Sequence, residues 1–160
     1  MRALQVVLAI LFAFVVQTLW GRYVSPERGY FDLFLLTAAV SGLAGGRVVG
    51  MSAGTAAGLV QDAFSGGMLG LNGLSKTVVG YLAGLVGNRF ILRGFPARFM
   101  FFLLASATDL AVLFLLGLAV GRPLVWGRGL LPLYIALGNG LIGSLIVGAG
   151  ERLRRRRERL

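Results

Sequence analysis

Hydrophobic and polar positions divide the chain into six apolar stretches, which arginine, glycine and proline separate from one another. The stretches cover residues 3–20, 31–46, 48–63, 73–92, 97–120 and 130–150. About 20 helical residues cross a bilayer core about 30 Å thick, so each stretch is a candidate transmembrane helix, although the second and third are short. The sequence therefore predicts an all-α integral membrane protein, with a compact bundle of six transmembrane helices over residues 1–150 and a polybasic cytoplasmic tail over 151–160.

Glycines at every fourth position mark the second and third stretches. They stand at positions 42, 46, 50, 54 and 58, and Gly80 and Gly84 give the fourth stretch a similar surface. Small residues let helix backbones approach closely inside a membrane. Packing within the bundle is the main interpretation of this pattern, and a face that lines a ligand is the alternative.

The composition supports a membrane protein and limits the kinds of catalytic and metal-binding site that it could hold. Of the 160 residues, 57% are hydrophobic and 14% are charged, and the mean hydropathy is +0.83, which is too apolar for a soluble globule of this length. Cysteine and histidine are absent, which excludes disulfides, thiol nucleophiles, imidazole bases and the usual zinc ligand sets. We therefore expect no cofactor and no metal.

The positive charge predicts an orientation in the membrane. The formal net charge is +10, but the arginines cluster at the ends of apolar stretches and in the tail, which indicates anionic lipid rather than nucleic acid as the partner. We expect both termini in the cytoplasm. The arginines on that side are then Arg2, Arg47, Arg89, Arg93, Arg98 and the six of the tail, against Arg22, Arg28, Arg122 and Arg128 outside. An acidic cytoplasmic partner is the alternative ligand of the tail.

The first stretch is not expected to be a cleaved signal. Its apolar run is longer than the apolar region of a signal peptide, and no small-x-small cleavage site follows it. We therefore predict a retained first helix.

The densest group of polar residues lies in residues 61–81, QDAFSGGMLGLNGLSKTVVGY. Its glycines predict a turn between two helices, with Asn72 as a cap for the second of them. The segment lacks the GK[ST] ending of a phosphate-binding loop, and adjacent residues such as Ser75 and Lys76 do not face each other on a helix. Neither a phosphate site nor a Ser-Lys catalytic pair is therefore expected.

Ionisable residues occur at membrane depth, where an unpaired charge costs a few kcal/mol. They are Asp62, Lys76 and Asp109, with Asp32 at the start of the second stretch. Because Asp62 and Lys76 flank the same short linker, we predict that they form an ion pair. We expect Asp109 to bind a hydroxyl or amide donor such as Asn139. A structural ion pair is the main interpretation, and a proton or substrate pathway and an enzymatic acid and base are the alternatives.

Residues 61–84, QDAFSGGMLGLNGLSKTVVGYLAG, resemble the most recognisable segment of the MreD family, the rod shape-determining membrane proteins of bacteria. The chain length, the six-stretch layout and the DLFLL sequence at residues 32–36 support this resemblance. The resemblance implies a non-catalytic scaffold of the elongasome, or Rod complex, which inserts lateral-wall peptidoglycan at the bacterial inner membrane. It implies MreC as the direct partner, and MreB, RodA and the transpeptidase partner of RodA as indirect ones.

The same resemblance implies a fold similar to the S-component of energy-coupling-factor transporters. A small-molecule-binding subunit of a transporter is therefore the alternative function, in which Ala9 and Ala13 would dock the transport partner. For the scaffold, we expect a glycine-lined helix face to grip the transmembrane helix of MreC. The candidate partner or pocket residues are Asp62, Asn72, Lys76, Asp109, Gly54, Gly58, Gly80 and Gly84.

Overall fold

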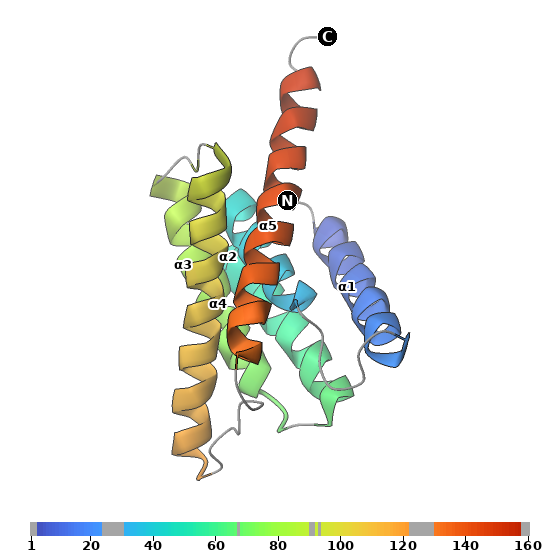
Figure 1. Cartoon of the computed structure of the whole chain (residues 1–160), viewed down its shortest axis with the longest axis vertical. Helices are drawn as coiled ribbons and strands as arrows, with labels where there is room; N and C mark the ends of the chain where they lie inside the picture. Colours follow the sequence, from blue (N-terminus) through green and yellow to red (C-terminus); the bar gives the residue numbers. More distant parts are fainter. Residues whose placement is uncertain are drawn as a thin grey trace.

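The fold is all-α over the residues that the computed structural model describes, which are 3–23, 31–66, 68–89, 92, 94–121 and 130–157. The helices are α1 (Ala3–Tyr23), α2 (Leu33–Ser65), α3 (Leu71–Arg89), α4 (Gly94–Ala119) and α5 (Leu131–Arg157), and they are drawn in Figure 1. Four of them, α1, α2, α4 and α5, are long and apolar enough to cross a membrane. The prediction of an all-α membrane protein is confirmed at this level.

The number of helices differs from the prediction, because residues 31–46 and 48–63 belong to one helix, α2, that folds back on itself. Gly46 interrupts α2 with φ 82° and ψ −174°, a conformation open to glycine because it has no Cβ. The interruption lies at the boundary between the second and third predicted stretches, and the chain reverses there without a loop. We call residues 33–45 the first arm of α2 and residues 47–65 its second arm.

Glycines hold α2 against α3 at backbone contact distance. A Cβ atom on Gly50 would overlap the backbone of Gly80, and one on Gly54 would overlap the carbonyl group of Lys76. We call this contact the glycine seam; it comprises Gly42, Gly50, Gly54, Gly58, Gly80 and Gly84. The seam confirms a packing role for Gly42, Gly50, Gly54 and Gly58. Gly46, the remaining glycine of the fourfold pattern, instead interrupts the helix.

The remaining helices pack around this centre. On α5, Gly140 and Gly143 leave room for the rings of Phe99 and Phe102 of α4. Helix α1 packs against α2 alone among the described helices, and its buried residues are Ile10 and Ala13. Helix α5 continues without a break beyond residue 150, so the predicted boundary between domain and tail lies inside a helix.

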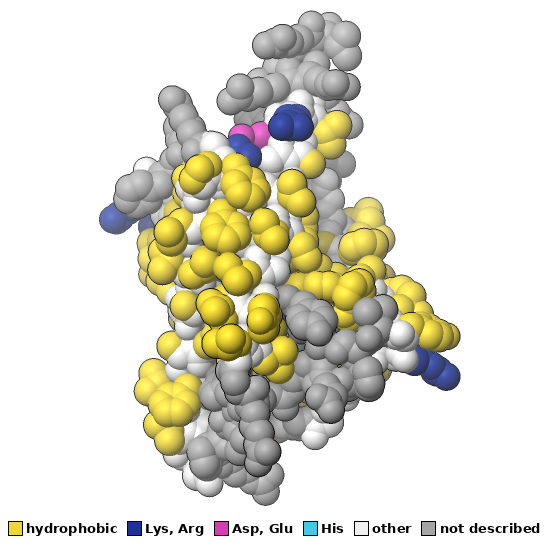
Figure 2. Space-filling view, in the orientation of Figure 1, with side chains coloured by type: hydrophobic (Ala, Val, Ile, Leu, Met, Phe, Trp, Pro, Cys, Tyr) yellow, Lys and Arg dark blue, Asp and Glu magenta, His cyan; other side chains and the backbone are white. Residues whose placement is uncertain are grey.

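The outer surface is apolar, as contact with lipid requires. Large hydrophobic side chains are exposed on α1, α4 and α5, for example Phe12, Leu115 and Leu145. In Figure 2, hydrophobic side chains gather over a large part of one face, with Lys and Arg side chains toward its edges. Exposed apolar area on this scale is unusual for a soluble protein and typical of a membrane protein. Several arginines of the expected orientation, Arg2, Arg28, Arg93, Arg122, Arg128 and Arg159, lie outside the described residues.

Candidate functional site: a buried polar network

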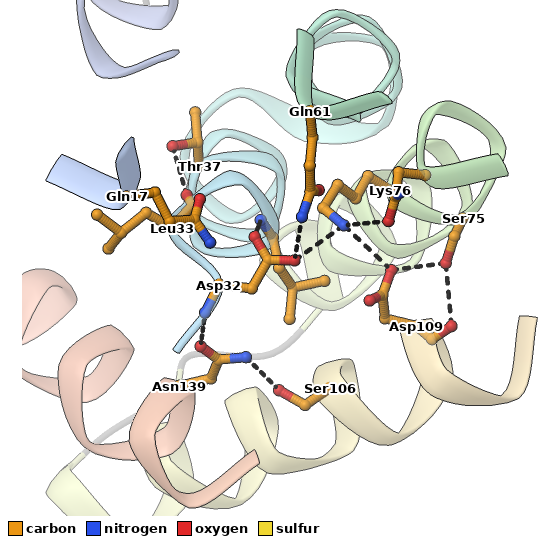
Figure 3. Close-up of polar contacts among 12 residues, drawn as sticks. Gln17, Asp32, Leu33, Thr37, Gln61, Ser75, Lys76, Ser106, Asp109 and Asn139 are labelled. Carbon is orange, nitrogen blue, oxygen red and sulfur yellow. Dashed lines mark hydrogen bonds and ion pairs between the residues drawn. The ribbon is translucent and has the colours of Figure 1, made fainter. Parts of the chain in front are cut away.

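Lys76 is the centre of a polar network inside the bundle. Its side chain projects from α3 and is fully buried. The Nζ atom lies 2.9 Å from Oδ2 of Asp32 and 3.7 Å from Oδ1 of Asp109, and it donates a hydrogen bond of 3.3 Å to Oδ1 of Asn72 (Figure 3). A lysine at this depth is stable only with such partners, because an unpaired charge in the membrane is costly.

Asp32 joins both arms of α2 to the rest of the network. It caps the first arm, where its Oδ1 accepts a hydrogen bond from the backbone N–H of Leu35 at 3.0 Å. Its Oδ2 also accepts from the amide of Gln61, in the second arm, at 3.4 Å. Asp32 thus accepts hydrogen bonds from both arms of α2 and forms an ion pair with Lys76 of α3.

The backbone of Asp32 reaches α5 and, through it, α4. Its N–H donates to Oδ1 of Asn139 at 2.7 Å, and the amide nitrogen of Asn139 donates to Oγ of Ser106 at 3.0 Å. Asn139 is fully buried, and both its amide oxygen and its amide nitrogen have hydrogen-bond partners. This chain of contacts ties the start of α2 to α4 and α5.

Asp62 does not pair with Lys76, and the predicted ion pair is wrong. Its carboxylate instead accepts hydrogen bonds from the backbone N–H groups of Gly70, Asn72 and Gly73 at 2.8, 3.2 and 3.1 Å. Gly70 directly precedes α3, and Asn72 and Gly73 lie in its first turn, where backbone donors lack partners within the helix and favour negative charge. Asp62 therefore caps α3, a role that the sequence assigned to Asn72.

Asn72 links this cap to the lysine. Its amide nitrogen donates to Oδ1 of Asp62 at 2.8 Å, while its amide oxygen accepts from Lys76. The two residues expected to pair are therefore joined through a third side chain.

Asp109 finds a hydroxyl donor, as expected, but on α3 rather than on α5. Oγ of Ser75 lies 2.6 Å from Oδ1 of Asp109 and 3.1 Å from its backbone carbonyl oxygen. Asn139, the donor suggested by the sequence, binds Asp32 and Ser106 instead. Ser75 and Lys76 thus both face Asp109, although they are neighbours in sequence.

The structure brings together four of the eight residues singled out from the sequence. Asp62, Asn72, Lys76 and Asp109 belong to the network, whereas Gly54, Gly58, Gly80 and Gly84 belong to the glycine seam. The seam is closed by α2 and α3 themselves, so these glycines cannot also grip a partner helix. The network also includes Asp32, Gln61, Ser75 and Ser106, for which the sequence predicted no partner. Asn139 belongs to it as well, but with partners other than the expected Asp109.

The network's contacts cross all of the interfaces at the centre of the bundle. They connect the two arms of α2 with α3, α4 and α5 in the low-polarity interior, where a satisfied hydrogen bond or ion pair has few competitors. Among the described residues, no group of three or more acidic residues is placed to hold a metal ion. The arrangement is suited to fixing helix positions.

Fold and site together define a helical membrane protein whose buried charged residues join its helices to one another. The chain belongs to the MreD family: the family model described as rod shape-determining protein MreD matches residues 1–123, which include α1 to α4. The resemblance found in the sequence is thereby confirmed, and the protein has a role in rod shape determination. No curated protein and no solved structure matches the chain.

Proposed function

We propose that the protein is a non-catalytic scaffold of the elongasome in the bacterial inner membrane, where it binds MreC and supports lateral peptidoglycan synthesis. The observation that carries the proposal is the family match over residues 1–123. The buried polar network supports it, because its carboxylates and its lysine form contacts that join helices and helix ends. Contact with MreB, RodA and the transpeptidase partner of RodA is indirect, through MreC.

Both termini lie in the cytoplasm in this proposal. Asp32 and Gln61 meet, so α2 starts and ends at the same side of the bundle. The other four helices each run in one direction, and in Figure 1 α1 runs downward from its start while α5 runs upward to its end. The arginines at the C-terminal end of α5 and in the residue positions that follow it favour the cytoplasmic side, where they attract anionic lipids.

The surface that supports partner binding best is α1. Since the glycine seam is closed, a transmembrane helix of MreC must bind where the bundle faces lipid. Helix α1 has two buried residues and packs on one neighbour, so most of its apolar surface is free for a partner, including Leu8, Phe12 and Val15. Van der Waals contact along such a surface is the main attraction between helices in lipid.

Affinity purification in a mild detergent tests the scaffold. We expect MreC to co-elute with the protein, and a photo-crosslinking residue at Phe12 to capture it. A crosslinker at Leu115, an equally exposed residue of α4, is the matched control and should not. Co-elution of a vitamin-uptake ATPase without MreC would instead favour the transporter subunit and the S-component-like fold, which stays a prediction. The docking pair suggested for that alternative is not free, because Ala13 is 1% exposed.

A further inference from the structure

The three carboxyl groups of the buried polar network differ in how their charge is compensated. Asp62 faces three backbone N–H groups at the start of α3, and Asp32 caps α2 and lies 2.9 Å from Lys76. Asp109 lies inside α4, away from both of its ends, and the Lys76 ammonium is 3.7 Å from it. In the described part of the chain, no backbone N–H group at a helix N-terminus donates a hydrogen bond to its carboxyl group, in contrast to Asp62 and Asp32. A carboxylate there costs more free energy than at either of the other two sites.

The contact between Ser75 and Asp109 places one hydroxyl group between two oxygen atoms of Asp109. Oγ of Ser75 is within hydrogen-bond distance of both the carboxyl group and the backbone carbonyl oxygen of Asp109, as Figure 3 shows. A serine hydroxyl has one hydrogen but can accept two hydrogen bonds. An ionised Asp109 would offer only acceptors, so that hydrogen would be divided between two partners. A neutral carboxyl group can donate to Oγ at 2.6 Å, which leaves the serine hydrogen for the carbonyl oxygen at 3.1 Å.

We propose that Asp109 is a proton-binding site within the membrane. Its neutral carboxyl group donates to Ser75, and Lys76 pairs with the ionised Asp32. The charged groups that face Asp109 are Lys76 from α3 and Asp32 from α2, with Asp62 reached through Asn72. From α5 the neighbouring polar group is the neutral amide of Asn139, and the Arg98–Glu151 ion pair between α4 and α5 lies about three helical turns away.

The proton on Asp109 selects the partner of Lys76. The ammonium lies between the two carboxyl groups, at 2.9 and 3.7 Å, so a small movement exchanges one partner for the other. Loss of the proton creates a second carboxylate that competes for Lys76. Because Asp32 also holds Gln61 and Asn139, this competition acts on the two arms of α2 and on α5. Proton occupancy thus controls how firmly the first arm is held.

Infrared spectroscopy of the intact protein tests the proposal directly. With aspartate labelled by carbon-13, we expect one protonated carboxyl group at neutral pH, seen as a labelled C=O band apart from the carboxylate bands. The band should vanish in Asp109→Asn. If the labelled wild-type protein shows carboxylate bands alone, the proposal is wrong, and this measurement needs no variant to fold. A protonated band that persists in Asp109→Asn would assign the proton to another aspartate and would equally overturn it.

A comparison of two matched variants gives an independent readout. Asp109→Asn keeps a donor toward Ser75 and has no carboxyl group to ionise on unfolding, so we expect its melting temperature in detergent at neutral pH to equal or exceed that of the wild-type protein. Asp32→Asn leaves Lys76 without its charged partner and should melt roughly 10 °C lower. In the wild-type protein, the folded-to-unfolded ratio should also fall about tenfold per pH unit above the range where a free aspartate ionises, a dependence that Asp109→Asn lacks. Equal destabilisation by the two variants would contradict a neutral Asp109.

Discussion

Asp32 and Gln61 lie at opposite ends of α2, yet the amide of Gln61 donates to the carboxylate of Asp32 at 3.4 Å. The two residues are 29 positions apart, and a straight helix would separate them by about 43 Å at 1.5 Å per residue. Gly46 makes the contact possible, because the chain reverses there without a loop. Both Asp32 and the second arm of α2 are thereby brought to Lys76.

The reversal at Gly46 gives the first prediction. Gly46→Ala should lower the free energy of unfolding by about 1–3 kcal/mol, because the backbone conformation at this position excludes a side chain. The neighbouring Asn88 leaves space for a methyl group, so the loss would come from the backbone itself. Denaturant titration in detergent measures it. The control is Gly21→Ala in α1, where the space is open and alanine should be neutral or stabilising; an equal loss in both variants would refute the special role of Gly46.

The glycine seam gives the second prediction. Gly54→Ala places a methyl group against the carbonyl group of Lys76 and should destabilise the protein by about 1–3 kcal/mol, because one of the two helices has to move. Gly150→Ala is the same substitution at an open position of α5 and should be tolerated. Thermal unfolding followed by size-exclusion chromatography compares them. A fully stable Gly54→Ala protein would show that α2 and α3 are not in backbone contact.

The choice of partner by Lys76 gives the third prediction. In double-mutant cycles, Lys76→Met and Asp32→Asn should be coupled by about 0.5–3 kcal/mol, because they remove the two sides of one ion pair. The cycle of Lys76→Met with Asp62→Asn should show a smaller coupling, since only Asn72 connects those two residues. A larger coupling to Asp62 would restore the pairing that the sequence suggested.

The cap on α3 gives the fourth prediction. Asp62→Ala removes the acceptor of three backbone N–H groups and should cost about 1–3 kcal/mol. Asp62→Asn should lose less, because asparagine is also a good capping residue. Hydrogen exchange at residues 70, 72 and 73 should become faster in the alanine variant. Unchanged exchange at these amides would mean that Asp62 does not cap α3.

The proposed orientation gives the fifth prediction, and the absence of native cysteine makes it simple to test. Leu69→Cys lies in the exposed turn between α2 and α3 and should react in intact spheroplasts with a thiol reagent that cannot cross membranes. Leu153→Cys, which is also exposed, should react only after the membrane is permeabilised. The opposite result would place the termini outside.

The sequence predicts which residues are polar and buried better than it predicts their partners. Apolar stretches and glycine spacing are patterns among nearby positions in the sequence, so the helices and the packing role of the seam glycines could be predicted from them. The partners of Lys76 depend on the backbone angles of Gly46, and a glycine in the sequence does not specify which of its many conformations it adopts. Without that reversal, Asp62 is the aspartate nearest to Lys76 along the chain, which is why the sequence predicts that the two residues pair. The contact of Asp32 with Asn139, 107 positions away, has no local signal at all.

The reversal at Gly46 also bears on how the protein enters the membrane. The first arm of α2, residues 33–45, is about 20 Å long, which is shorter than the hydrocarbon core of a bilayer. It therefore cannot be released into lipid as an independent segment during synthesis. We therefore expect the two arms to insert together as one helical hairpin, and Asp32 to gain its ion-pair partner only after Lys76 of α3 has been synthesised.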